Sequence, residues 1–155
     1  MVVEQERPPY EAYAAIAASF AGVLATAGAL GRLLDREPQC RTSLDFAILA
    51  LASFKAARTL AHDRVSAPMR APFVEGEAGA EDEVPIRSGG MQQAIGELVT
   101  CTRCVGTWAA AGLASTQIVA PRFGRLLTWS LGAAAANDFL QAGFNAVCDK
   151  ANELS

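Results

Sequence analysis

Residues 12–31 read AYAAIAASFAGVLATAGALG, a run of twenty residues that contains no charge and no proline. As a helix with a rise of about 1.5 Å per residue, this run is about 30 Å long, which matches the hydrocarbon core of a bilayer. Core helices of soluble bundles usually keep a polar stripe, and this run lacks one. The run therefore predicts a transmembrane helix, and a buried helix of a soluble bundle is the alternative.

The composition of the whole chain agrees with a membrane protein of one domain, residues 1–155. Hydrophobic residues make up 52% and charged residues 19%, against usual values of about 45–50% and about 25% in soluble proteins. With 13 basic and 16 acidic residues the net charge is −3, so we expect no nucleic-acid partner. The leader before the first run is acidic, which favours a retained anchor over a cleaved signal.

Three further apolar stretches follow the first. The expected fold is an all-α membrane protein with four transmembrane helices, at about residues 12–31, 43–62, 101–120 and 126–147. A short helix at 91–100 leads into the third of these. The polar segment between the second and third helices contains Pro68, Pro72 and Pro85, which exclude one continuous helix. Five acidic residues lie among small ones there, so we expect a flexible acidic loop at 74–90.

The distribution of basic residues predicts the orientation. Four crossings place both termini and the long loop on one side of the membrane. That side carries seven Lys and Arg residues and the opposite side five: Arg7, Lys55, Arg58, Arg64, Arg70, Arg87 and Lys150 against Arg32, Arg36, Arg41, Arg122 and Arg125. The excess favours cytoplasmic termini.

Small residues recur every fourth position in two of the apolar runs. They are Ala14, Ala18 and Gly22 in the first run, and Gly106, Ala110 and Ala114 in the third. Such faces allow close approach of helix backbones in a membrane. Chance in an alanine-rich chain explains the pattern equally well.

Cys101 and Cys104 form a Cys-x-x-Cys motif, the sharpest local signal in the chain. Cysteines three residues apart on one helix face suit a dithiol–disulfide couple or half of a tetrahedral metal site. His62 and Cys148 fall on the same predicted side of the membrane and could complete a zinc site. Cys40 falls on the opposite side and could not. Packed thiols without chemistry are the third interpretation.

Charged residues inside predicted transmembrane helices indicate either a pairing partner or a functional site. Lys55, Arg58 and His62 share one stripe of the second helix, and Asp138 lies near the middle of the fourth. Cations near a helix end can also simply reach lipid headgroups. The second and fourth helices should run in the same direction, with Lys55 and Asp138 at equal depth. We therefore predict neighbouring helices and a contact of about 4 Å or less from Asp138 to Lys55 or Arg58.

Several catalytic signatures are absent from the sequence: a Ser/His/Asp set, HExxH, a P-loop and GxGxxG. A single histidine leaves little capacity for acid–base chemistry near neutral pH. We therefore expect no catalysis and no cofactor, with zinc at the cysteines as the alternative.

Five segments, taken in order, resemble a known family. They are SFKAARTL at 53–60, DRV at 63–65, PMRAPFVE at 68–75, ELVTCTRCVGTW at 97–108 and NDFLQ at 137–141. Their order resembles domain-of-unknown-function family 1360, small bacterial multi-pass membrane proteins. The Cys-x-x-Cys-x-Gly-x-Trp block, with Gly106 and Trp108, is the most specific element, and Pro72 lies in another. The resemblance implies a bacterial inner-membrane protein and brings no activity, cofactor or substrate with it.

Three functions follow from these observations. The first is a non-enzymatic accessory or scaffold subunit that binds the lipid bilayer and other membrane subunits or a second copy of itself. The second is a membrane thiol protein that handles redox equivalents or metal through Cys101 and Cys104. The third is a small ion- or proton-coupled carrier that uses Lys55, Arg58 and Asp138.

Overall fold

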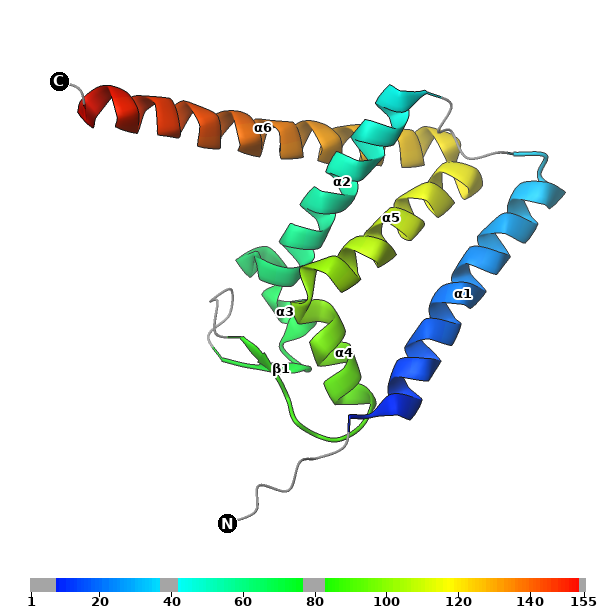
Figure 1. Ribbon diagram of the computed structural model, residues 1–155. Helices are drawn as coiled ribbons and strands as arrows, with labels where there is room; N and C mark the ends of the chain where they lie inside the picture. The colour runs from blue at the N-terminus through cyan, green and yellow to red at the C-terminus, as the bar shows by residue number, and fades with distance from the viewer. Residues whose placement is uncertain (1–7, 37–41, 77–82, 154–155) are drawn as a thin grey trace, which may run out of the picture.

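A computed structural model describes residues 8–36, 42–76 and 83–153, which fold mainly into α-helices (Figure 1). The elements in chain order are α1 Tyr10–Leu33, α2 Ser43–His62, a 3-10 turn Arg64–Ser66, α3 Ala67–Arg70, β1 Val74–Glu75, β2 Val84–Pro85, α4 Met91–Thr100, α5 Thr102–Val119 and α6 Pro121–Glu153. The prediction of a helical chain is confirmed.

Local signals explain where the helices begin. Thr42 and Asp45 form a capping box, in which each side chain accepts a hydrogen bond from the other residue's backbone N–H. Helix α2 therefore spans residues 43–62, as expected. The predicted bounds 126–147 for the last helix are wrong at both ends, because α6 spans Pro121–Glu153. Pro121 begins the helix, where no backbone N–H is needed, and the polar tail continues it.

Helix α2 lies between α5 and α6, and α1 packs against α5 and α4 (Figure 1). Ala52 and Ala57 of α2 are 0% and 1% exposed, so small residues set the close packing at the centre. The contacts fix the directions of the helices: α1 runs parallel to α5, α2 runs antiparallel to α5, and α6 runs parallel to α2. The four long helices thus alternate in direction along the chain.

The second half of α6 extends beyond the other helices as a free arm (Figure 1). From residue 137 to residue 153 every side chain is exposed except Cys148, which is half-buried. The exposed set includes large apolar side chains: Phe139, Leu140, Phe144 and Val147. Phe139 is partly covered by Phe54 of α2, whereas Leu140, Phe144 and Val147 are about 70% exposed.

The described parts of the predicted flexible loop at 74–90 are ordered, which corrects that expectation. Val74 pairs with Pro85 and Glu75 with Val84 in an antiparallel ribbon, while residues 77–82 lie outside the described residues. The ribbon packs directly on α4: a Cβ added at Gly96 would lie 2.5 Å from the Phe73 carbonyl oxygen. The acidic composition of residues 74–90 predicted exposure to solvent. It did not indicate the contact with α4, because this contact joins residues that are distant in the sequence.

Among the described helices, α1 is the one that is both long and apolar enough to cross a membrane by length and composition. Its most apolar 18 residues have a mean hydropathy of 1.7, and 11% of that window is buried. Lys55 and Arg58 lower the mean hydropathy of α2, and Asp138 lowers that of α6. Threonine, serine and glutamine residues lower the mean hydropathy of α5. The expectation of four transmembrane helices is not supported by this criterion.

The two stripes of small residues differ in their surroundings. Gly106 of α5 faces α2, and a Cβ added there would meet the Ala57 methyl group at 3.8 Å. Ala14, Ala18 and Gly22 of α1 are exposed instead. The stripe on α5 therefore serves packing within the chain, and the stripe on α1 does not.

Candidate functional site

The two cysteines of the Cys-x-x-Cys motif lie at the corner between α4 and α5. Cys101 is the N-cap of α5, and its sulfur accepts a hydrogen bond of 3.3 Å from the Cys104 backbone N–H. The Cys104 thiol donates to the same sulfur, with 2.6 Å between the Sγ atoms. Cys101 is half-buried, and Cys104 is exposed. The fold thus places the two cysteine side chains in direct contact at a helix N-terminus.

The hydrogen bonds make the two thiols unequal. The hydrogen bond donated by the Cys104 thiol lowers the pKa of Cys101. Backbone N–H groups of Cys104 and Arg103 and the positive charge of Arg103 also lower it, while burial raises it. Both thiols precede the apolar run that begins at Val105. Cys101 is therefore the more nucleophilic sulfur, since the thiolate is the reactive form.

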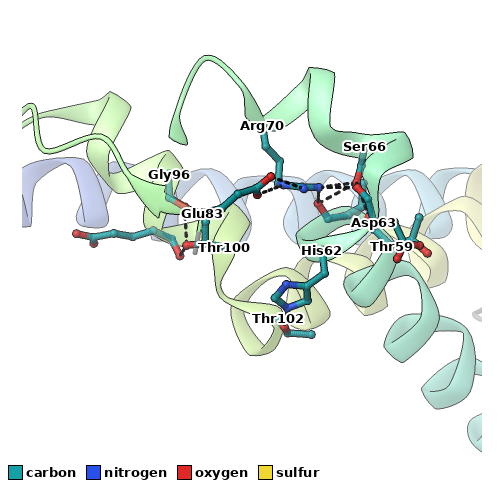
Figure 2. A network of polar contacts seen from close by, with 11 residues as sticks. Thr59, His62, Asp63, Ser66, Arg70, Glu83, Gly96, Thr100 and Thr102 are labelled. Atoms are coloured by element: carbon teal, nitrogen blue, oxygen red, sulfur yellow. Dashed lines mark hydrogen bonds and ion pairs between the residues drawn. The ribbon is translucent and has the colours of Figure 1, made fainter. Parts of the chain in front are cut away.

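The structure does not assemble the zinc site considered from the sequence. Within the described ranges, no three His, Cys, Asp or Glu side chains are placed to hold a metal ion. Cys148 lies on the projecting arm of α6, away from the corner that carries Cys101 and Cys104 (Figure 1). His62 Nε2 instead lies 2.8 Å from Thr102 Oγ1 (Figure 2). Cys40 lies outside the described residues.

The predicted contact between α2 and α6 is present. Lys55 Nζ lies 2.7 Å from Asp138 Oδ2, within the expected limit, and the two side chains are 25% and 46% exposed. Phe54 and Phe139, the neighbouring pair, stack with ring centroids 5.6 Å apart. Arg58 is exposed on the same face one turn further. The sequence predicted either Lys55 or Arg58 as the partner of Asp138, and the structure shows that the partner is Lys55.

A buried ion pair that the sequence did not reveal holds the end of α2. The Arg70 side chain is 2% exposed and Glu83 is 6% exposed. Arg70 Nε and Nη2 donate to the two Glu83 carboxylate oxygens at 2.8 and 3.0 Å. Its Nη1 donates to the carbonyl oxygens of Leu60 and Asp63 and to Ser66 Oγ, at 2.8, 3.2 and 2.6 Å (Figure 2). The guanidinium thus joins the ribbon to the last turn of α2.

The remaining family-motif residues also surround this end of the molecule. The Pro72 carbonyl oxygen accepts a hydrogen bond from Gln92 Nε2 at 2.8 Å, which ties the turn after α3 to α4. Trp108 packs edge-to-face on Phe20 of α1, with ring centroids 5.0 Å apart. Both residues therefore have structural contacts that explain their positions.

The segments that build this corner define a known class of protein. The chain belongs to the family described as "Protein of unknown function (DUF1360)", whose model matches residues 48–144. It is similar to sporulation protein YjcA of Bacillus subtilis (strain 168), with 35% identity over 85 residues, which cover 51% of this chain and 72% of the relative. No solved structure matches the chain. The family expectation is confirmed, while the multi-pass character and the role of the cysteines stay predictions.

Proposed function

We propose that this chain is an integral protein of a bacterial inner membrane, with α1, α2, α5 and α6 in the bilayer and both termini in the cytoplasm. In this proposal it acts without catalysis, as an accessory or scaffold subunit of a membrane assembly. The alternating directions of the four long helices support the topology. The main support is the apolar surface that these helices leave uncovered.

The size of the exposed surface supports a lipid or protein cover. The chain exposes 10758 Å², whereas a compact soluble protein of 16.2 kDa exposes about 7,500 Å². Large apolar side chains are exposed on α1, α2 and α6. Soluble monomers rarely expose contiguous apolar patches of more than a few hundred Å². A bilayer removes this surface from water without requiring a further domain.

The arm of α6 is the part of the surface that we assign to partner subunits or to a second copy. Phe139, Leu140 and Phe144 are 57%, 72% and 69% exposed on this arm. Aromatic side chains such as Phe139 and Phe144 are enriched at protein interfaces relative to the rest of the surface. The arm continues beyond the helices of its own chain, so a partner can pack on it without displacing them.

Two experiments test the membrane part of this proposal. The chain should stay in the membrane fraction after a carbonate wash, since its apolar helices need lipid. In a variant with its four cysteines changed to serine, a membrane-impermeant maleimide applied to intact cells should label Ala120→Cys and leave Ser88→Cys unlabelled. Release by carbonate, or labelling of Ser88→Cys alone, contradicts the proposal.

The subunit role is tested through the arm. Mild purification from native membranes should retain a stoichiometric partner or a dimer of this chain. Phe144→Ala should weaken this association, and the control Asp149→Asn should leave it unchanged. The name of the Bacillus subtilis relative supplies a physiological setting for the test, and we propose that this chain supports spore formation in a host that forms spores. Deletion should then lower the yield of heat-resistant spores, and a Phe144→Ala copy should restore less of it than Asp149→Asn.

The geometry of Cys101 and Cys104 favours a second candidate function, that of a membrane thiol protein. An N-cap cysteine with a lowered pKa, in contact with a second thiol, is the arrangement used by dithiol redox motifs. Changing either cysteine to serine should then abolish function in the host. If the double serine variant complements a deletion fully, the thiols serve packing alone.

A further inference from the structure

An apolar cavity lies between α1, α4 and α5, next to the cysteine corner. Its volume is about 390 Å³, within the range of about 300–1,000 Å³ that small-molecule sites occupy. Phe20 and Trp108 line it, together with Ile16, Ala17 and Leu98. The Cys104 thiol also lines it, whereas Cys101 lies behind that thiol. One sulfur of the dithiol therefore faces an apolar chamber.

The cavity also has a polar side. The Glu97 carboxylate lines it, accepts a hydrogen bond from the Tyr13 hydroxyl, and accepts a second from Gln93 Nε2 at 2.9 Å. Tyr13 is itself part of the lining. A ligand in this cavity would thus meet aromatic faces, one thiol, and a hydrogen-bonded pair of a carboxylate and a phenol.

We propose that this cavity binds a quinone, which oxidises Cys101 and Cys104 to a disulfide. The inference rests on the second function proposed above, thiol redox chemistry, and names its electron acceptor. Two features select a quinone. The walls are apolar and aromatic, and a dithiol releases two electrons and two protons together, as a quinone requires. In the proposed topology, a lipid-soluble ring can reach the cavity from the bilayer.

The chemical step balances with the two thiols, the quinone and solvent protons. Cys104, whose thiol lines the cavity, passes its proton to the Cys101 thiolate across their hydrogen bond, and the Cys104 sulfur bonds to the ring. Cys101 then releases this proton to solution and attacks the Cys104 sulfur. The sulfur–ring bond breaks, and its electron pair stays on the ring. The two ring oxygens take up two protons from solution, which replace the proton released in this step and the one that Cys101 lost on becoming a thiolate. Two thiols and one quinone become one disulfide and one hydroquinone.

Ubiquinone-1 added anaerobically to the reduced protein in lipid nanodiscs tests the proposal. With Trp129→Phe as the background, Trp108 is the remaining indole and reports binding by quenching. We expect saturable quenching and one hydroquinone per disulfide, measured by maleimide trapping and mass spectrometry. Ala17→Phe fills the cavity from α1 and should slow oxidation by about tenfold or more, because enclosure of the ring provides the binding energy. Ala18→Phe, also exposed on α1 but outside the lining, should oxidise at the parent rate.

A soluble oxidant separates the outcomes. Diamide should form the Cys101–Cys104 disulfide equally fast in both phenylalanine variants, which shows that the corner is intact. If diamide forms the disulfide but ubiquinone-1 does not, or oxidises Ala17→Phe as fast as the parent, the quinone site is wrong and thiol chemistry stands. If no oxidant forms the disulfide, the quinone site and the thiol function are both wrong.

Discussion

Removing the guanidinium of Arg70 should cost more stability than removing any exposed charge of this protein. The Arg70→Met substitution keeps much of the apolar stem and deletes five hydrogen bonds: two to Glu83, two to carbonyl oxygens at the end of α2 and one to Ser66 of the 3-10 turn. The partner carboxylate is 6% exposed, so water cannot replace the lost donors without opening the ribbon. Deleting one member of such a buried pair costs about 3–5 kcal/mol.

The same reasoning gives an expected value for Glu83→Gln and for the double variant. Glutamine keeps the shape of the side chain but leaves the guanidinium without its counter-charge, so this change should also cost several kcal/mol, on the order of 3. The double variant Arg70→Met with Glu83→Gln should cost less than the sum, with a coupling of about 1–3 kcal/mol, since residues in one network are not additive. The exposed pair Lys150–Glu153 supplies the control, and Lys150→Met should change stability by about 0.5 kcal/mol or less.

Thermal unfolding followed by circular dichroism in one detergent measures these differences. For a chain of this size about 1 kcal/mol corresponds to a shift of roughly 2–4 °C, so Arg70→Met should lower the midpoint by about 6–20 °C. A shift no larger than that of Lys150→Met would refute the reasoning. Additive single changes would show that Arg70 and Glu83 do not stabilise each other.

Three further predictions follow from the helix contacts and the thiols. In lipid vesicles Asp138→Asn should destabilise the protein by about 2 kcal/mol or more, because a lone cation in hydrocarbon costs about 2.5–3.5 kcal/mol. The control Asp149→Asn should leave stability unchanged. A loss of stability below about 1 kcal/mol in Asp138→Asn would place the ion pair in water. Gly132→Leu should cost about 1–3 kcal/mol by chemical denaturation because its Cβ would lie 3.0 Å from a side chain of α2, whereas Gly143→Leu, with open space around it, should be tolerated. Alkylation of Cys101 by iodoacetamide against pH should show a midpoint below that of an ordinary thiol, since a hydrogen bond lowers its pKa; a midpoint above it would contradict the geometry.

The helices and one of their contacts were predictable from the sequence because the signals are local or additive. Apolar runs give helix positions directly, and the bounds of α2 coincide with the expected 43–62. The contact of Lys55 with Asp138 follows from the cost of two isolated charges and from counting residues along parallel helices. Neither inference requires knowledge of side-chain packing.

The features that the sequence did not reveal depend on how distant segments meet. Arg70 and Glu83 are thirteen residues apart in the sequence, and the pairing of β1 with β2 places Glu83 near Arg70. The acidic composition around Glu83 suggested solvent exposure, whereas its carboxylate is buried and paired with the Arg70 guanidinium. The length of α6 was missed for a different reason. Pro121 could end one helix and instead begins the next, and the polar residues up to Glu153 continue α6 beyond the apolar run.

The buried pair and the cysteine corner are mechanically connected. Arg70 holds the last turn of α2 through the carbonyl oxygens of Leu60 and Asp63. His62 lies between these two residues in the sequence, and its Nε2 lies 2.8 Å from Oγ1 of Thr102, the first residue of α5 (Figure 2). Cys101 caps the same helix one residue earlier. Loss of the Arg70 bonds should therefore loosen the N-terminus that lowers the pKa of Cys101, so Arg70→Met should also shift the alkylation midpoint of that thiol upward. An unchanged midpoint in a folded Arg70→Met variant would show that α4 alone positions the dithiol.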